Sequence, residues 1–204
     1  MSFRVEEKIF IKSENLIQFK EYLNKKLVEK IYHPRVIESI YFDNLNLDMH
    51  VDSIEGLTPR KKIRIRKYPR EKDTNVYLEI KHSTVEGRYK SRKIINNKEY
   101  NQLQSNGILD KQYGICNPKL YVKYLREYMI YKDVRISIDN NIEYKDYKTN
   151  FTSNDNRTIV ELKTSYKKNL DDLYSEFPFQ RIRFSKYCFA VEKLFNKRFW
   201  LNFI

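Results

Sequence analysis

Strict alternation of charged and apolar residues in several short segments is the feature that most limits the fold of this chain. In KKIRIRKY (61–68), Lys62, Arg64 and Arg66 occupy even-numbered positions, whereas Ile63 and Ile65 occupy odd-numbered ones, so the two sets differ in parity. Successive side chains of a β-strand point to opposite faces, so this order predicts a strand with one cationic and one apolar face. Period-two patterns predict eight strands, near 3–12, 36–43, 60–68, 75–82, 88–95, 119–130, 133–139 and 157–164.

Helical spacing is confined to a few segments. The eight predicted strands follow one another with mostly short connections and few intervening helices, which favours antiparallel pairing. We therefore predict an α+β fold and one domain over residues 1–204. The predicted helices cover 13–30 with Ser13 as the N-cap, 97–106 ending at Gly107, about 167–176, and about 185–197.

The chain is basic, with 40 Lys and Arg against 27 Asp and Glu, which gives a formal net charge of +13. No apolar run approaches the roughly 20 residues that span a bilayer, and charged residues occupy the N-terminus where a signal peptide has its apolar core. We therefore expect a cytoplasmic protein.

Cysteine and histidine spacing argues against several kinds of site. Cys116 and Cys188 lack the spacing of a zinc site or a disulfide framework, and we expect both to be small buried residues. His33, His50 and His82 show neither a metalloprotease motif nor the order of a catalytic triad. Histidine catalysis is therefore not expected.

Basic residues recur two positions from a carboxylate on the polar faces of several predicted strands. If eight strands close into a barrel with the apolar face outward under helices, these charged faces converge on a lumen. Arg and Lys in such a lumen suit the phosphate groups of a polyanion. The polar faces concerned are Arg4, Glu6 and Lys8; Lys62, Arg64 and Arg66; Glu79 and Lys81; Arg135, Ser137 and Asp139; Glu161 and Lys163.

The carboxylates among these cations need a separate explanation because they repel phosphate. One or more of them is expected to bind a hard divalent cation that bridges to phosphate oxygens. For Glu79, a structural ion pair with a neighbouring Lys or Arg is an equally good interpretation. For Glu161 we favour the metal.

Short motifs along nearly the whole chain resemble those of the polyphosphate polymerase (vacuolar transporter chaperone, VTC) domain family, within the triphosphate tunnel metalloenzyme superfamily. Each motif is short, but their order and spacing together are specific. The aromatic residue often found after R-I-R in the family is Lys67 here. The matching motifs are RVEEK at 4–8, SIYFD at 39–43, RKKIRIRKY at 60–68, LEIK at 78–81, GRYKSR at 87–92, PKLYVKYLR at 118–126, Arg135 with Ser137 and Asp139, VELK at 160–163, and SKY at 185–187.

The resemblance implies a closed eight-stranded antiparallel β-barrel, the triphosphate tunnel, with flanking α-helices. It implies transfer of the γ-phosphoryl group of ATP to a growing inorganic polyphosphate chain, with Mn²⁺ or Mg²⁺ as cofactor. It places Lys8 on the tunnel floor, where it contributes to ligand binding, and leaves the roles of Arg4, Glu6 and Lys163 open. Glu161 is implied as the metal ligand. The residues implied to bind phosphate and carry the reaction are Arg64, Arg66, Lys81, Lys90, Arg126, Arg135 and Lys186.

Two alternative functions stay open at this point. An enzyme of the same fold hydrolyses tripolyphosphate or a nucleoside triphosphate when a metal-oriented water replaces the phosphate acceptor. The other alternative is a non-catalytic polyanion-binding module. We do not expect nucleic acid as the ligand, because the resemblance directs many of the cations into a lumen too narrow for folded RNA. A membrane-protein partner, if one exists, is not encoded in this chain.

Overall fold

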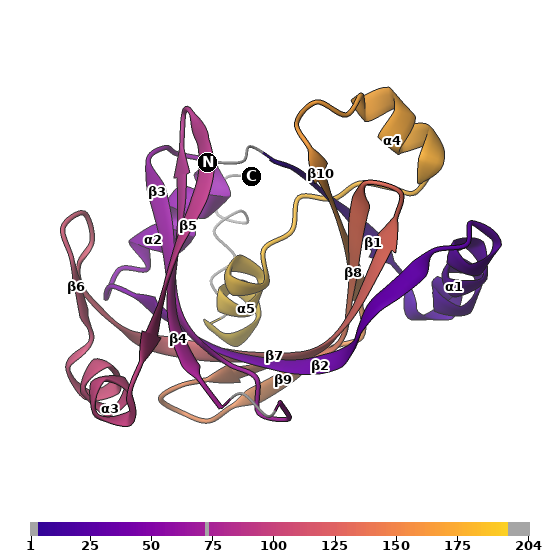
Figure 1. Cartoon of the computed structure of the whole chain (residues 1–204). Coiled ribbons are helices and arrows are strands. Elements are labelled where there is room, and N and C mark those ends of the chain that lie inside the picture. Colours follow the sequence, from indigo (N-terminus) through magenta and orange to yellow (C-terminus); the bar gives the residue numbers. More distant parts are fainter. Residues whose placement is uncertain (1–3, 72–73, 196–204) are drawn as a thin grey trace, which may run out of the picture. The chain divides into compact units, whose positions relative to one another are not determined.

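The computed structural model describes residues 4–71 and 74–195 (Figure 1). Its strands are β1 (Arg4–Ile11), β2 (Glu29–Asp43), β3 (Arg60–Lys67), β4 (Val76–Thr84), β5 (Gly87–Ile95), β6 (Ile108–Asp110), β7 (Gly114–Tyr131), β8 (Val134–Asp146), β9 (Thr152–Asp155) and β10 (Thr158–Ser165). Its helices are the 3-10 turn η1 (Ser13–Asn15), α1 (Leu16–Lys25), α2 (Asp48–Glu55), α3 (Asn97–Asn106), α4 (Leu170–Glu176) and α5 (Lys186–Phe195). Each predicted strand is present, so the α+β prediction is confirmed.

The prediction of a closed eight-stranded barrel is wrong. Hydrogen bonds join the strands in the order β1-β10-β8-β7-β2-β3-β4-β5, with β6 beside β7 and β9 beside β8, in a ten-stranded sheet. The register pairs that define β1, β10, β8, β2, β3, β4 and β5 are antiparallel, as predicted. Over the described residues this path is open, with β1 and β5 at its two ends.

Both end strands show why the path stops. On β1, Ile9 forms an isolated antiparallel bridge with Arg181, and the backbone N–H of Ile182 donates to the carbonyl of Lys8 at 2.8 Å. A connecting segment therefore takes the hydrogen bonds that another strand would need. On β5, the side chains on both faces of the strand are exposed from Arg88 to Ile94, and many of them are charged. This pattern is typical of edge strands.

The helices differ from their predicted limits at specific positions. The helix predicted over 13–30 ends at Lys25 because Leu27 adopts a left-handed backbone conformation (φ 56°) and the chain then enters β2. Ser13 lies in η1, and Asn15 is the residue that precedes α1. The helix predicted over 97–106 is confirmed, with Gly107 at φ 75° after its last residue. Residues 196–197 of the last predicted helix lie outside the described residues.

Two compact units divide the chain, and each is described by itself. Unit 1 comprises Met1–Val36, Tyr124–Ile142 and Asp155–Phe184, and unit 2 comprises Ile37–Lys123, Glu143–Asn154 and Ser185–Ile204. The prediction of one domain over residues 1–204 stays a prediction. Among the described helices, none combines the length and the apolar character needed to cross a membrane.

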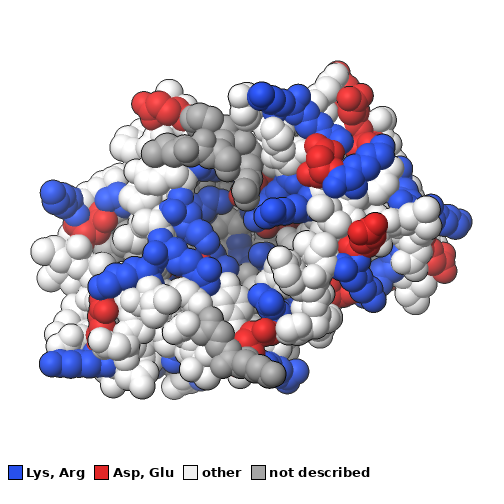
Figure 2. Space-filling model, viewed as in Figure 1, with Lys and Arg blue, Asp and Glu red and all other residues white. Residues whose placement is uncertain are grey.

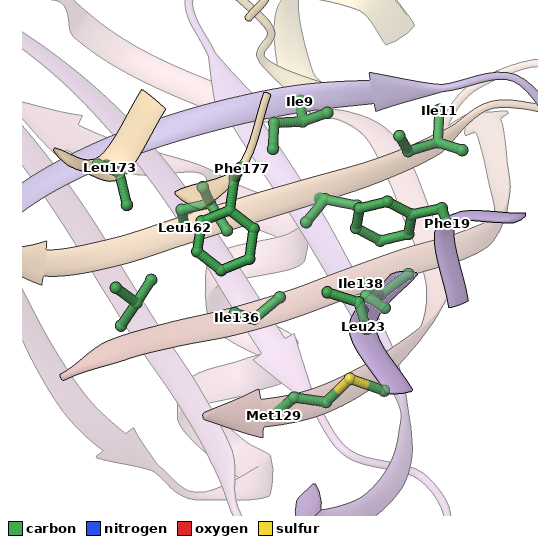
Figure 3. Packing of buried hydrophobic residues seen from close by; sticks show 12 residues of the cluster. Ile9, Ile11, Phe19, Leu23, Met129, Ile136, Ile138, Leu162, Leu173 and Phe177 are labelled. Atoms are coloured by element: carbon green, nitrogen blue, oxygen red, sulfur yellow. The ribbon is translucent and has the colours of Figure 1, made fainter. Parts of the chain in front are cut away.

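Unit 1 has its core on the apolar face of β1, β10 and β8, under α1 and α4 (Figure 3). Phe19 and Leu23 project from α1, and Leu173 projects from α4, toward the side chains of the strands. Burial of these residues confirms that the apolar face of the strands is covered by helices in this unit. The strand residues of the cluster are Ile9, Ile11, Met129, Val134, Ile136, Ile138, Val160 and Leu162.

Unit 2 shows the same alternation, but a helix also covers part of its charged face. Ile63 and Ile65 of β3 are buried, as predicted. On the opposite face, the ring of Tyr187 in α5 stacks on Tyr41 of β2 with centroids 5.2 Å apart, and Lys62 Nζ donates to Ser185 Oγ at 2.8 Å. Helix α5 therefore packs on the polar side of β2 and β3 and limits the space in front of it.

Candidate polyanion-binding site

The polar face of β2–β5 in unit 2, here called the cationic face, is organised in three rows across the strands. The register brings side chains of β3, β4 and β5 directly opposite one another, because each strand pairs antiparallel with the next. In Figure 2, Lys and Arg side chains gather over the region of these strands. Row one is Lys62–Lys81–Lys90, row two is Tyr41–Arg64–Glu79–Arg92, and row three is Ser39–Arg66–Tyr77–Ile94.

Glu79 is the buried centre of this face, with 1% of its surface exposed. Its Oε2 lies 2.7 Å from Arg64 Nη2 and 3.7 Å from Arg66 Nη1, and its Oε1 lies 3.0 Å from Lys90 Nζ and 3.4 Å from Arg92 Nε. Burial by itself raises the pKa of Glu79, but the charges of Arg64, Arg66 and Lys90 outweigh it and lower the pKa to about 2. Glu79 is thus an ionised structural partner of four cations.

Row one places three lysines side by side. Lys62 is opposite Lys81, which is opposite Lys90. Like charges directly opposite one another destabilise a sheet, so an anion in front of this row would be favourable even though Lys90 already contacts Glu79 and Lys62 contacts Ser185. Burial lowers the pKa of Lys62, and the positive charge of Lys81 adds to that effect. An anion in front of row one would relieve both costs.

Tyr41 connects the cationic face to the start of α5. Its hydroxyl accepts a hydrogen bond from Arg64 Nη1 at 3.0 Å. Burial raises the pKa of Tyr41, but the charges of Arg64, Arg66 and Lys186 together with that hydrogen bond lower it overall. Lys186, the first residue of α5, therefore adds its charge to row two.

Asp43 fixes α2 and α5 against the end of β2. Its carboxylate accepts hydrogen bonds from the backbone N–H groups of Asn44, Met49 and His50, and from the Tyr187 hydroxyl. Burial raises the pKa of Asp43 despite these donors, and burial together with Asp43 raises the pKa of Tyr187. Because Tyr187 follows Lys186, this contact sets the position of the Lys186 backbone.

In unit 1, Arg126 on β7 forms a two-point ion pair with Asp139 on β8. Arg126 Nε lies 2.5 Å from Asp139 Oδ1, and Arg126 Nη2 lies 2.7 Å from Asp139 Oδ2. Burial lowers the pKa of Arg126, but the charge of Asp139 outweighs it and raises the pKa well above its usual value. Asp139 holds two of the three guanidinium nitrogens and so fixes the plane of this side chain.

Glu161 on β10 shares this face of unit 1 with Lys163 and Glu6. Lys163 Nζ lies 3.0 Å from Glu161 Oε2 and 3.9 Å from Glu6 Oε1, and Arg126 Nη2 lies 3.8 Å from Glu161 Oε2. Two carboxylates therefore bracket one ammonium group. Within residues 4–71 and 74–195, no group of three or more His, Cys, Asp or Glu side chains is placed to hold a metal ion.

Lys8 and Arg135 lie in unit 1 as well. Lys8 is opposite Glu161 in the register, and its Nζ donates to the carbonyl of Phe184 at 2.5 Å. Arg135 is opposite Lys163 and lines an open pocket together with Asp133, Lys163, Thr164 and Ser165. The side chain of Arg4 lies outside the described part of the chain.

Comparison with protein-family models gives the family of this chain. The model of the VTC domain family matches residues 3–195. The chain belongs to the VTC domain family. The family resemblance inferred from the sequence is therefore confirmed. Comparison with curated protein sequences gives no match.

Solved structures similar to this VTC domain are distant in sequence. A putative adenylate cyclase from Bacillus halodurans has 10% identity and a TM-score of 0.62, with 95% of this chain and 98% of that chain covered. A putative adenylate cyclase from Vibrio parahaemolyticus has 12% identity and a TM-score of 0.56, with 94% and 98% covered. The PH1012 protein from Pyrococcus horikoshii has 12% identity and a TM-score of 0.54, with 88% and 92% covered. At these identities the likeness establishes the fold.

The predicted site residues of the VTC domain divide between the two units. The cationic face of unit 2 contains Arg64, Arg66, Lys81 and Lys90, with Lys186 beside it. Unit 1 contains Lys8, Arg126, Arg135 and Glu161. For Glu79, the ion-pair interpretation is the one that the contacts support.

Several residues of the site were not among the predicted ones. Arg92 appeared only in a matching motif, yet its Nε lies 3.4 Å from Glu79 Oε1. Tyr41 lies two residues after Ser39 in the strand SIYFD, so both side chains point to the same face. This spacing was a usable signal that Tyr41 lies on the cationic face. The contact between Asp43 and Tyr187 joins residues 144 positions apart in the sequence, and no local pattern predicts it.

Arg64 and Arg66 are expected to respond differently to alanine substitution. The Arg64 side chain is 23% exposed and its loss leaves Glu79 with three cations, so Arg64→Ala should weaken tripolyphosphate binding about tenfold or more and lower stability less than Arg66→Ala does. The Arg66 side chain is 7% exposed and donates to Ser39 Oγ at 3.2 Å, so Arg66→Ala should also lower stability, by about 1–3 kcal/mol. Calorimetric titration and thermal unfolding measure the two effects. Equal losses of stability in both variants would contradict this distinction.

Proposed function

We propose that this VTC domain is a metal-dependent polyphosphate polymerase that transfers the γ-phosphoryl group of ATP to the end of an inorganic polyphosphate chain. The observation that carries the proposal is the cationic face, where four cations surround the single buried carboxylate of Glu79 and three lysines form a row. This excess of positive charge suits a ligand with several adjacent phosphate groups. Membership of the VTC domain family favours the polymerase among phosphate-handling functions.

The reaction makes few chemical demands on the side chains. A terminal oxygen of polyphosphate attacks the γ-phosphorus of ATP, the bond from that phosphorus to the β–γ bridging oxygen breaks, and ADP leaves with the electron pair. Catalysis of this kind rests on alignment and on neutralisation of charge. Arg64, Arg66, Lys81, Lys90 and Lys186 would bind and orient the phosphates, and a side-chain nucleophile is not required.

In unit 1, Lys8, Arg126 and Arg135 are the proposed phosphate-binding cations. Asp139 fixes the Arg126 guanidinium through two contacts, so this side chain would present a constant orientation to an anion. Arg135 lines its pocket beside Lys163, where two positive charges lie opposite each other in the register. These cations would hold phosphate groups of the donor or the acceptor.

Glu161 is the residue proposed to hold Mn²⁺ or Mg²⁺, with Glu6 beside it. The donor set fits a hard divalent cation, because both side chains offer carboxylate oxygens and both already share one cation, Lys163. Magnesium is commonly bound through one or two protein carboxylates, with substrate phosphates and waters as the other ligands. A bound divalent ion would neutralise charge on the phosphoryl group that is transferred.

The function is tested by incubating the purified protein with ATP and Mn²⁺ and resolving the products on a gel. We expect long polyphosphate chains and ADP. Lys90→Ala, which removes a cation of row one, should lower the rate at least tenfold. Lys93→Ala is the matched control, because the exposed Lys93 side chain lies on the opposite face of β5 and pairs with Glu99 at 2.7 Å.

The other outcomes of this experiment identify the alternatives. Free phosphate without polymer would identify a triphosphate hydrolase. Binding of tripolyphosphate without turnover, in the presence of Mn²⁺ or Mg²⁺, would identify a polyanion-binding module. Either result would replace the polymerase proposal.

A further inference from the structure

Row three gives the cationic face an apolar end. Arg66 is opposite Tyr77, and Tyr77 is opposite Ile94. Ile94 is 57% exposed although it has the same parity on β5 as Lys90 and Arg92. Charge on this face therefore decreases in one direction, from the lysines of row one to the aromatic and aliphatic side chains of row three.

Tyr68 extends the apolar end, and Arg92 joins it to the ion cluster. Tyr68, the residue after β3, has the parity of Arg66, and its ring lies 6.0 Å from the ring of Tyr77 at an interplanar angle of 76°. The Arg92 guanidinium lies 3.5 Å from the centroid of Tyr77, while its Nε lies 3.4 Å from Glu79 Oε1. One side chain thus touches both the aromatic group and the centre of the cationic face.

Inorganic polyphosphate has no apolar group that could pack against the aromatic and aliphatic side chains of this apolar end. A nucleoside triphosphate has a polyanionic end and a flat, largely apolar base, and its base can stack on Tyr rings and on Arg guanidinium planes. We propose that Tyr68, Tyr77 and Ile94, with the Arg92 guanidinium, form a base-binding subsite for a nucleoside triphosphate. This inference rests on the proposed function and adds to it the place and the direction of the donor.

The direction follows from the spacing along β3. Arg66 in row three and Lys62 in row one are four residues apart, about 13 Å along a strand. A base at row three would place the three phosphates along row two toward row one. The terminal phosphate would then lie nearest the row of three lysines.

The test compares the affinities of ATP and of inorganic tripolyphosphate by calorimetric titration with the full chain. The subsite variants are Tyr77→Leu, which keeps apolar volume, and Ile94→Ser, which changes an exposed side chain and so leaves the fold intact. We expect ATP affinity to fall about tenfold in Tyr77→Leu, which removes a stacking partner of the base, and a few-fold in Ile94→Ser, which removes apolar contact area, while tripolyphosphate affinity stays within about twofold in both. Tyr89→Leu is the matched control, because Tyr89 has the opposite parity on β5 and stacks on His82.

The outcomes separate this subsite from the proposed function. Parallel losses of ATP and tripolyphosphate affinity in Ile94→Ser and Tyr77→Leu would show that row three supports the ion cluster and does not bind a base. Equal affinities of the unmodified protein for ATP and tripolyphosphate would overturn the subsite and leave a triphosphate-binding function standing. Absence of binding to either ligand would overturn both.

Discussion

Replacing Glu79 with glutamine is expected to destabilise the protein by about 3–5 kcal/mol, because removal of one partner from a buried ion cluster leaves the other charges uncompensated. Four cations lie within 4 Å of this carboxylate in the native structure. Glutamine keeps the shape of the side chain and removes its charge, so the loss reports electrostatics and not packing. Urea unfolding of both proteins at neutral pH measures it.

The Glu79 variant should also respond more strongly to added polyanion. Tripolyphosphate would supply the negative charge that glutamine lacks, so it should raise the melting temperature of Glu79→Gln more than that of the unmodified protein. Glu99→Gln serves as the control, because Glu99 forms a more exposed pair with Lys93 and its loss should change stability by no more than about 1 kcal/mol. Equal stability of Glu79→Gln and the unmodified protein would contradict the structural role of this carboxylate.

The same substitution should remove a pH dependence of stability. The pKa of Glu79 is lowered from 4.5 to about 2 in the folded protein, so the unfolded chain binds the proton more readily than the folded one. The stabilisation is therefore complete above the unfolded pKa and is lost as the pH falls from about 4.5 toward 2, with a total of about 3 kcal/mol. Unfolding measured between pH 6 and pH 3 should show this extra loss in the unmodified protein, but not in Glu79→Gln.

Glu161→Gln is expected to lower the rate of polyphosphate synthesis about 100-fold or more and to change ATP affinity only a few-fold. If Glu161 holds the divalent ion, its loss removes the charge that stabilises the transferred phosphoryl group, while the arginines and lysines still bind the phosphates. Rates from the gel assay and affinities from calorimetry separate the two effects. Manganese binding, followed by paramagnetic resonance, should weaken in parallel with the rate.

The control for Glu161 is a carboxylate on the other face of the neighbouring strand. Glu7 of β1 has the opposite parity to Glu6, and its Oε2 lies 3.8 Å from Arg181 Nε. Glu7→Gln should leave synthesis unchanged. Undiminished synthesis by Glu161→Gln at the same Mn²⁺ concentration would refute the metal assignment and leave Glu6 as the next candidate, because Glu79 is engaged by four cations.

Strand faces were predictable from the sequence because the alternation is a local property. Ile63 and Ile65 are buried, and Lys62, Arg64 and Arg66 share the other face, as the period-two pattern of 61–68 predicted. The end of α3 before Gly107 was predictable for the same kind of reason, since a glycine adopts φ 75° without steric cost. Cys116 and Cys188 are buried, as expected.

Features that depend on distant partners were not predictable in this way. Helix α2 has only eight residues, and its start is held by Asp43, which also accepts a hydrogen bond from Tyr187 in α5. The 13–30 segment keeps its apolar spacing beyond Lys25, but the chain turns at Leu27 and β2 begins at Glu29 instead. Packing between elements decided both limits, because neither helix is long enough to be stable by local propensity.

The sequence by itself determined which residues line each face of each strand, because side-chain direction in a strand follows from parity alone. Only the tertiary structure decided which of those residues meet, since register and pairing depend on contacts between strands far apart in the chain. The four cations around Glu79, the lysine row and the apolar end at Tyr77 and Ile94 all arise from that register. The open ends of the sheet have the same origin, because β1 is capped by the segment around Ile182 and β5 carries charges on both faces.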